Sequence, residues 1–171
     1  MITVMRYGHR PMRDKRTTTH VGLVARAFGA DRILLAGTGG VPKSILDVVD
    51  RWGGDFRVET VREWRRFLRD FQGTRIHLTM YGLPLGETID EIRERSLKGD
   101  LLIFVGAEKV PPEVYEWCDY NVAVGSQPHS EIAALAVFLD HLHRGAELEC
   151  EFPGAELRVV PSERGKEVKE L

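Results

Sequence analysis

The chain has 171 residues, a net charge of −2 and 29% charged residues, which is typical of one globular domain with a sizeable core. No apolar run approaches the roughly 20 residues of a membrane span, and the N-terminus lacks the apolar region of a signal peptide. Cys118 and Cys150 are too few for a disulfide framework or a metal cluster, which favours a cytoplasmic protein without a bound metal.

Apolar strands alternate with amphipathic helices along most of the chain. The expected strands are residues 2–7, 31–37, 56–61, 74–80, 100–106 and 120–125. The expected helices are residues 19–30, 43–52, 62–71, a segment near 88–97, and a helix with Pro128 in its first turn. Such repeated units with continuous apolar strands predict an α/β fold with a parallel sheet covered on both faces.

The end of the chain has a different pattern. Residues 147–152 and 156–160 flank Pro153-Gly154-Ala155, which predicts a β-hairpin followed by a frayed tail at 162–171. A lone hairpin is marginal in water, so we expect it to pack on the body or on a second copy of the chain. Residues 1–146 are therefore expected to form the main domain, and 147–171 an extension.

The segment VGSQPHSEIAALAVFLDHL, residues 124–142, joins a polar turn to an apolar helix. Ile132, Leu135, Ala136 and Leu139 recur at helical spacing, which predicts a buried helix. The unpaired N–H groups at its N-terminus favour an acceptor-rich partner. That partner is either a ligand or the protein's own loop, and this stretch alone leaves both open.

Charge is distributed unevenly along the chain. Residues 1–75 carry 15 lysines and arginines against 8 acidic residues, although the whole chain is slightly acidic. Such an asymmetry favours a localised patch that binds a polyanion. The residues expected to contact RNA phosphates are Arg6, His9, Arg10, Arg13 and Arg16. The arginine-rich face of residues 62–69 is a weaker candidate, because arginine also serves solubility.

Loops at the carboxyl ends of strands are the expected ligand sites of a parallel α/β sheet. The loop GTGGVPKS, residues 37–44, lies where a P-loop would, but Pro42 stands where a P-loop needs glycine, which favours a plain turn. The loops 80–86, 106–115 and 125–131 combine glycines, few charges and apolar side chains. They suit a flat, mostly apolar ligand such as adenine.

Three segments resemble a known family. The blocks are RYGHRPMRDKRTTTHVGLVARAFGAD, LTMYGLP and VGAEKVPPEVYEWCDYNVAVGSQPHSEIAALAVFLD, and together they are similar to the archaeal tRNA cytidine 2′-O-methyltransferases of the SPOUT superfamily. The resemblance implies a SPOUT-type parallel sheet with a deep C-terminal trefoil knot, an obligate homodimer, and S-adenosylmethionine as methyl donor. It implies a T-loop cytidine of tRNA, at position 56, as the substrate.

The resemblance also implies site residues. The cofactor-binding residues would be Leu83, Gly106, Ala107, Glu108, Lys109, Val110, Val124, Gly125, Ser126, Gln127, Pro128, His129, Ser130 and Glu131. Arg26 would act on the ribose hydroxyl, either as base or as electrostatic stabiliser, with His20 and Glu108 as further catalytic residues. The superfamily has asparagines where this chain has His20 and Ile132, so His20 or Glu131 is expected to substitute in any proton relay.

Three alternatives remain open. The first is a SPOUT enzyme that methylates a base nitrogen or a different ribose. The second is a non-catalytic RNA-binding module that has lost its cofactor. A nucleotide hydrolase acting through residues 37–44 comes last, because Pro42 removes an N–H that a phosphate would need.

Overall fold

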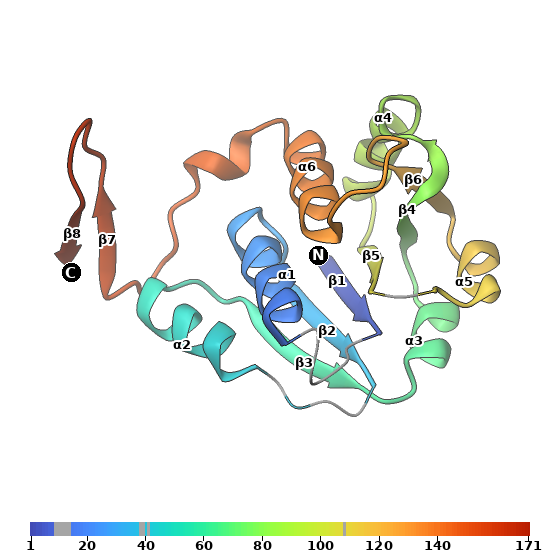
Figure 1. Ribbon diagram of the computed structural model, residues 1–171, viewed down its shortest axis with the longest axis horizontal. Coiled ribbons are helices and arrows are strands. Elements are labelled where there is room, and N and C mark those ends of the chain that lie inside the picture. Colours follow the sequence, from blue (N-terminus) through green and yellow to red (C-terminus); the bar gives the residue numbers. More distant parts are fainter. Residues whose placement is uncertain (9–14, 38–39, 41, 108) are drawn as a thin grey trace.

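The structure is a computed structural model that describes residues 1–8, 15–37, 40, 42–107 and 109–171. Its centre is a six-stranded, fully parallel sheet with the order β3-β2-β1-β5-β4-β6 (Figure 1). The strands are β1 (Ile2–Tyr7), β2 (Arg32–Ala36), β3 (Arg57–Val61), β4 (Thr74–Pro84), β5 (Leu101–Gly106) and β6 (Tyr120–Ala123). The predicted α/β class and parallel sheet are confirmed.

Helices cover both faces of the sheet, as continuous apolar strands require. The helices are α1 (Lys15–Ala27), α2 (Lys43–Trp52), α3 (Trp64–Asp70), α4 (Leu85–Ser96), α5 (Pro112–Trp117) and α6 (Glu131–His143). One apolar cluster joins the sheet to α1, α2, α4 and α6, and a second joins the opposite face to α3 and α5. Adjacent residues of β1, Val4 and Met5, belong to different clusters, because side chains alternate across a strand.

β4 leaves the ladder before it ends. Leu78 and Leu83 both pair with Val122 of β6, so residues 79–82 bulge out between them. A Cβ at Gly82 would lie 2.3 Å from the carbonyl oxygen of Asn121, so only glycine lets the two backbones approach so closely. The bulge sets Thr79, Met80 and Tyr81 at the carboxyl edge of the sheet.

The C-terminal hairpin differs from the prediction. β7 (Leu157–Val160) pairs antiparallel with β8 (Glu167–Glu170), so the tail expected to fray supplies the second strand. Residues 147–152 are not a strand and instead include the 3₁₀-helix η1 (Ala146–Glu149). The hairpin extends from the end of the molecule beside α2 (Figure 1), where the N–H of Glu156 donates to the carbonyl of Arg51.

Two helix predictions also need correction. α6 begins at Glu131 with Ser130 as its N-cap, so Pro128 precedes the helix instead of occupying its first turn. The six-residue helix α5 begins inside the segment 106–115, which was expected to be a loop, and runs two residues past it. Among the described residues, no helix is long and apolar enough to cross a membrane, and no group of His, Cys, Asp or Glu side chains is arranged to hold a metal ion.

Candidate functional site

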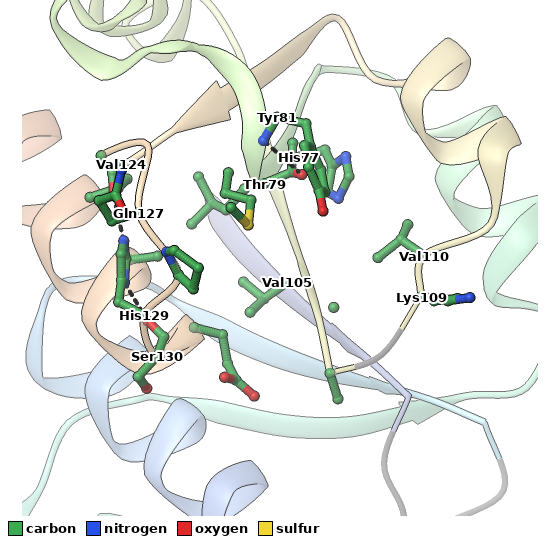
Figure 2. A pocket seen from close by; sticks show the side chains of 18 of the residues that line it. His77, Thr79, Tyr81, Val105, Lys109, Val110, Val124, Gln127, His129 and Ser130 are labelled. Carbon is green, nitrogen blue, oxygen red and sulfur yellow. Dashed lines mark hydrogen bonds between the residues drawn. The ribbon is translucent and has the colours of Figure 1, made fainter.

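A cavity of about 580 Å³ opens at the carboxyl ends of β4, β5 and β6 (Figure 2). Its walls come from the bulge of β4, the loop after β5, helix α5, and the turn between β6 and α6. The volume falls in the range of small-molecule sites, and the position is where parallel α/β sheets bind ligands. The three loops that the sequence singled out therefore meet around one pocket.

Most of the predicted cofactor-binding residues line this pocket. Those that do so are Gly106, Ala107, Lys109, Val110, Val124, Gly125, Gln127, Pro128, His129, Ser130 and Glu131. Leu83 and Ser126 are not part of the lining, and the side chain of Leu83 is 60% exposed. Glu108, expected both to bind cofactor and to take part in catalysis, lies outside the described residues.

The turn before α6 is held by its own side chains. The hydroxyl of Ser130 accepts a hydrogen bond from the N–H of Ile132 at 3.1 Å, which caps the helix. The ring of His129 bridges the turn, with its nitrogens at the carbonyl oxygens of Val124 and Ser130. The polar residues before the apolar helix therefore do both things that the sequence suggested: they satisfy the loop, and they form one wall of the pocket.

Eight residues of the lining were not in the predicted set, and four of them carry polar side-chain groups: His77, Thr79, Tyr81 and Tyr115. The side chain of His77 is 1% exposed, so it forms the floor of the pocket, and burial lowers its pKa. Its Nδ1 lies 2.9 Å from the side-chain oxygen of Asn121, and the hydroxyls of Thr79 and Tyr115 lie 3.2 Å apart. A polar histidine within the apolar strand pattern of residues 74–80 was the signal that could have identified the site.

Arg6 was expected to contact RNA, and the structure corrects this. Its side chain is fully buried in β1, and Nη2 donates to Oε1 of Glu131 at 2.8 Å. Arg6 therefore lies beneath the pocket wall, where it holds the first residue of α6. Of the remaining RNA-binding candidates, Arg16 is exposed on α1, and His9, Arg10 and Arg13 lie outside the described residues.

Arg26 lies away from the pocket of its own chain. It occupies the last turn of α1, which runs from the carboxyl edge of the sheet back to the amino edge. Nη2 donates to the carbonyls of Trp52 and Gly53 at 2.9 and 2.7 Å, and the guanidinium lies 4.2 Å from the ring centre of Phe152. Arg26 is therefore not part of the pocket that its own chain forms, and its expected action on the ribose hydroxyl stays a prediction. His20, exposed on α1, is not part of the lining either.

Comparison with known proteins identifies the family. The family model described as tRNA ribose 2′-O-methyltransferase, aTrm56, matches residues 52–169. A tRNA (cytidine(56)-2′-O)-methyltransferase of Pyrococcus horikoshii is 57% identical over 100% of this chain and 86% of its own length. A protein of the same name from Thermococcus kodakarensis is 57% identical over 100% of this chain and 98% of its own length. The chain belongs to this family.

Solved structures share the SPOUT fold at low sequence identity. The A. aeolicus TrmH/SpoU tRNA modifying enzyme matches with a TM-score of 0.56 at 14% identity, over 86% of this chain and 75% of that chain. The SpoU methyltransferase AviRb of Streptomyces viridochromogenes, solved with AdoMet, matches with a TM-score of 0.52 at 16% identity. That match covers 84% of this chain and 57% of AviRb. At this level of identity, the matches show a shared fold.

Proposed function

We propose that the protein is a tRNA (cytidine-56-2′-O)-methyltransferase that transfers the methyl group of S-adenosylmethionine to a ribose hydroxyl of the T-loop. The observation that carries the proposal is the identity of more than half of all residues with proteins of that name over nearly the whole length of both chains. The pocket at the carboxyl edge supports the proposal, because it is large enough for a small molecule and is lined by residues of the matched region.

The pocket residues fit an adenosine-containing ligand. Val105, Ala107, Val110 and Val124 offer apolar contact, and Gly106 and Gly125 let the backbone come close to a flat ring. S-adenosylmethionine supplies an already activated methyl group when it is bound. The protein must then hold the ribose 2′-oxygen in line with that methyl group and accept the hydroxyl proton.

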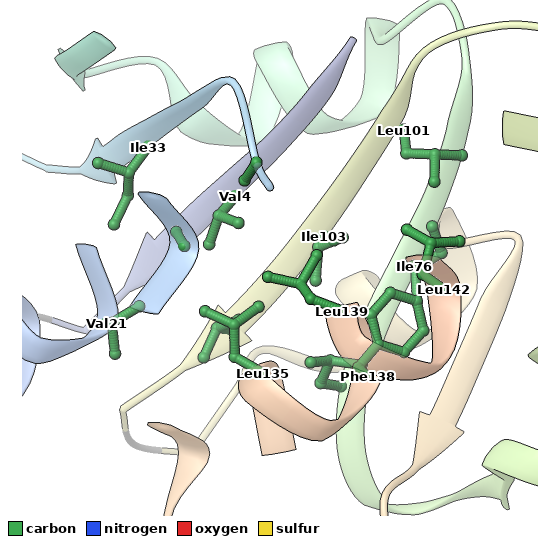
Figure 3. Close-up of a cluster of buried hydrophobic side chains, with 14 of the residues drawn as sticks. Val4, Val21, Ile33, Ile76, Leu101, Ile103, Leu135, Phe138, Leu139 and Leu142 are labelled. Atoms are coloured by element: carbon green, nitrogen blue, oxygen red, sulfur yellow. The ribbon is translucent and has the colours of Figure 1, made fainter. Parts of the chain in front are cut away.

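The active unit is a homodimer that pairs through α6. This helix buries Leu135, Phe138 and Leu139 against the sheet (Figure 3), yet its outer side exposes Ala133 and Val137 to solvent in the single chain. A helix that is apolar on all sides is normally covered on all sides, so a second copy of α6 is the natural cover.

A dimer would also give Arg26 a catalytic role. The pocket lies at the N-terminal end of α6, whereas Arg26 lies near the C-terminal end of that helix. The ends of α1 and α6 meet there, since a Cβ at Gly29 would be 2.9 Å from Nε2 of His143. Antiparallel pairing of two α6 helices brings the Arg26 of each protomer toward the pocket of its partner. There a guanidinium stabilises the alkoxide that develops as the ribose hydroxyl loses its proton.

Subunit complementation tests this arrangement. A heterodimer of an Arg26→Ala chain and a Gly125→Val chain, whose pocket is blocked, contains one complete composite site if Arg26 acts across the interface. Methyl transfer at about half of the wild-type rate is expected, while each mutant homodimer is inactive. An inactive heterodimer, with wild-type mass by light scattering, would exclude the role of Arg26 in the partner's pocket.

Residues 80–131 form the trefoil knot of this proposal, and 147–171 a stabilising extension. β4 lies between β5 and β6 in the sheet, and Gly82 packs against the backbone of Asn121, which supports threading of the later segment past the earlier one.

A chain that ends at Arg144 lacks Phe152, which packs on Arg26, and should aggregate or dissociate. A truncated chain that remains a stable dimer by light scattering would remove the stabilising role of the extension.

RNA binding depends on the basic N-terminal half of the chain, with Arg10, Arg13 and Arg16 as its proposed core. Replacing these three residues by alanine should weaken tRNA binding and reduce its salt dependence, because phosphate contacts release counterions. Binding of S-adenosylhomocysteine should stay unchanged. Unaltered tRNA affinity in the triple variant would move the patch elsewhere, and the face of residues 62–69 would be tested next.

The function itself is tested by mass spectrometry of digested tRNA after reaction with protein and S-adenosylmethionine. A 2′-O-methylcytidine at position 56 is the expected product. A methyl group on a base nitrogen or on another ribose would favour a different SPOUT activity. Binding of tRNA without any methyl transfer would favour a non-catalytic RNA-binding module.

A further inference from the structure

The floor of the pocket carries a histidine that the expected cofactor contacts leave without a role. His77 lies in β4, between Phe104 of β5 and Tyr115 of α5, and both rings meet it edge to face, at centroid distances of 5.7 and 4.6 Å. These contacts and its burial fix the orientation of the imidazole. A side chain held so firmly at the bottom of a ligand pocket is suited to recognise one particular group.

The hydrogen bonds of Asn121 determine which ring nitrogen of His77 carries the proton. Nδ2 of Asn121 donates to the carbonyl of Tyr115 at 2.9 Å, so Oδ1 is the amide atom that faces His77. An amide oxygen only accepts, and Nδ1 of His77, 2.9 Å away, must therefore be the N–H donor. Because burial lowers the pKa of His77, the ring is neutral, and Nε2 is left with a lone pair.

The surroundings of His77 offer several acceptor groups to a hydrogen-bond donor. No hydrogen bond from the described residues reaches Nε2. The neighbouring pocket residues supply hydroxyl groups and aromatic rings: Thr79, Tyr81 and Tyr115. Aromatic faces attract cations, and hydroxyl oxygens accept hydrogen bonds, whereas an ammonium group is a donor only. The apolar side chains that suit adenine belong to the other walls, at Val105, Ala107 and Val124.

We propose that Nε2 of His77 accepts a hydrogen bond from the α-ammonium of the methionine moiety of S-adenosylmethionine, and so fixes the amino-acid end of the methyl donor in the pocket. The inference rests on the proposed function, because it assigns a contact within that cofactor site. His77 is thereby a binding residue, and the Asn121 amide is the positioning group that holds its acceptor toward the ligand.

Two substitutions separate the two ring nitrogens. His77→Asn keeps an amide near the position of Nδ1, where it can still donate to Asn121, and removes the acceptor at Nε2. His77→Gln places an amide oxygen near the position of Nε2. The ligands are S-adenosylhomocysteine, which has the ammonium, and 5′-deoxy-5′-methylthioadenosine, which keeps the adenosine and the thioether but lacks the amino-acid group.

Calorimetry should show that His77→Asn weakens the binding of S-adenosylhomocysteine about 10- to 100-fold, which is the usual effect of losing a hydrogen bond to a charged group. The affinity of His77→Asn for methylthioadenosine should differ from that of the wild type by less than about twofold. His77→Gln should recover part of the lost affinity for S-adenosylhomocysteine. Equal losses for both ligands would place the contact at the adenosine, and no loss for either would remove His77 from the site. Both results overturn the inference, whereas wild-type protein that binds neither ligand would refute the proposed function itself.

A measurement on the wild-type chain avoids any effect of mutation on folding. Long-range ¹H–¹⁵N spectra of the histidine rings should assign the Nδ1–H tautomer to His77. The Nε2 resonance should move when S-adenosylhomocysteine binds and stay nearly unchanged with methylthioadenosine. An Nε2–H tautomer in the bound protein would contradict the inference, because such a nitrogen cannot accept the hydrogen bond.

Discussion

Arg26→Met should destabilise the fold measurably, since the guanidinium of Arg26, besides its proposed role in the partner's pocket, makes buried contacts within its own chain. The change removes two hydrogen bonds, to the carbonyls of Trp52 and Gly53, and the contact of the guanidinium with Phe152. Hydrogen bonds to a charged group contribute about 1.5–3 kcal/mol each, and a partly desolvated cation–π contact about 1–2 kcal/mol. Relief of the cost of burying the charge offsets part of the sum, because the guanidinium is only 7% exposed and burial lowers its pKa.

We therefore expect the free energy of unfolding to fall by about 2–4 kcal/mol. For a chain of this length the midpoint of thermal unfolding should fall by about 5–15 °C. Circular dichroism at a fixed protein concentration measures both quantities, and a fixed concentration matters for an oligomer. Arg51→Met is the matched control: this arginine is exposed on α2, and its replacement should cost less than about 0.5 kcal/mol. An equally small effect of Arg26→Met would refute the structural role.

Two further predictions test the pocket wall and the interior. Glu131→Ala removes the ion-pair partner of the fully buried Arg6, and it should lower the free energy of unfolding in urea by about 2–3 kcal/mol. This loss is somewhat below the usual range because the side chain of Glu131 is 31% exposed. The control Glu116→Ala, at an exposed position, should be nearly neutral, and equal stability of the two variants would contradict the pairing. Iodoacetamide at pH 8 should label the exposed Cys150 and spare Cys118, because burial raises the pKa of the Cys118 thiol to about 12, and equal labelling of both would contradict its burial.

The regular parts of the fold were predictable from local patterns. The helix expected at 43–52 is α2 with the same bounds, and each strand of the sheet was expected within a few residues of its observed limits, apart from β4, which runs on to Pro84. These segments follow the apolar period, which reports burial directly. Helix α5 was missed because six residues are too few to show a helical period.

Long-range pairing explains the remaining differences. The partner of β7 was assigned to residues 147–152, since the turn at Pro153-Gly154 is a strong local signal, but the ladder forms with β8 instead. Arg6 looked like part of a basic loop, and only its contact with Glu131, 125 residues away, shows that it is buried. The alternation of apolar and polar residues along a strand indicates which residues are buried, but it does not indicate which distant side chain will contact them.

Methylation of a defined tRNA transcript tests the central claim most directly. Purified protein, S-adenosylmethionine and a transcript with cytidine at position 56 are combined, and the digested RNA is examined by mass spectrometry beside a transcript that carries uridine at that position. The account predicts one 2′-O-methylcytidine at position 56 in the first transcript and none in the second. Methylation of any other nucleotide, or none at all by folded protein that binds both substrates, would contradict it.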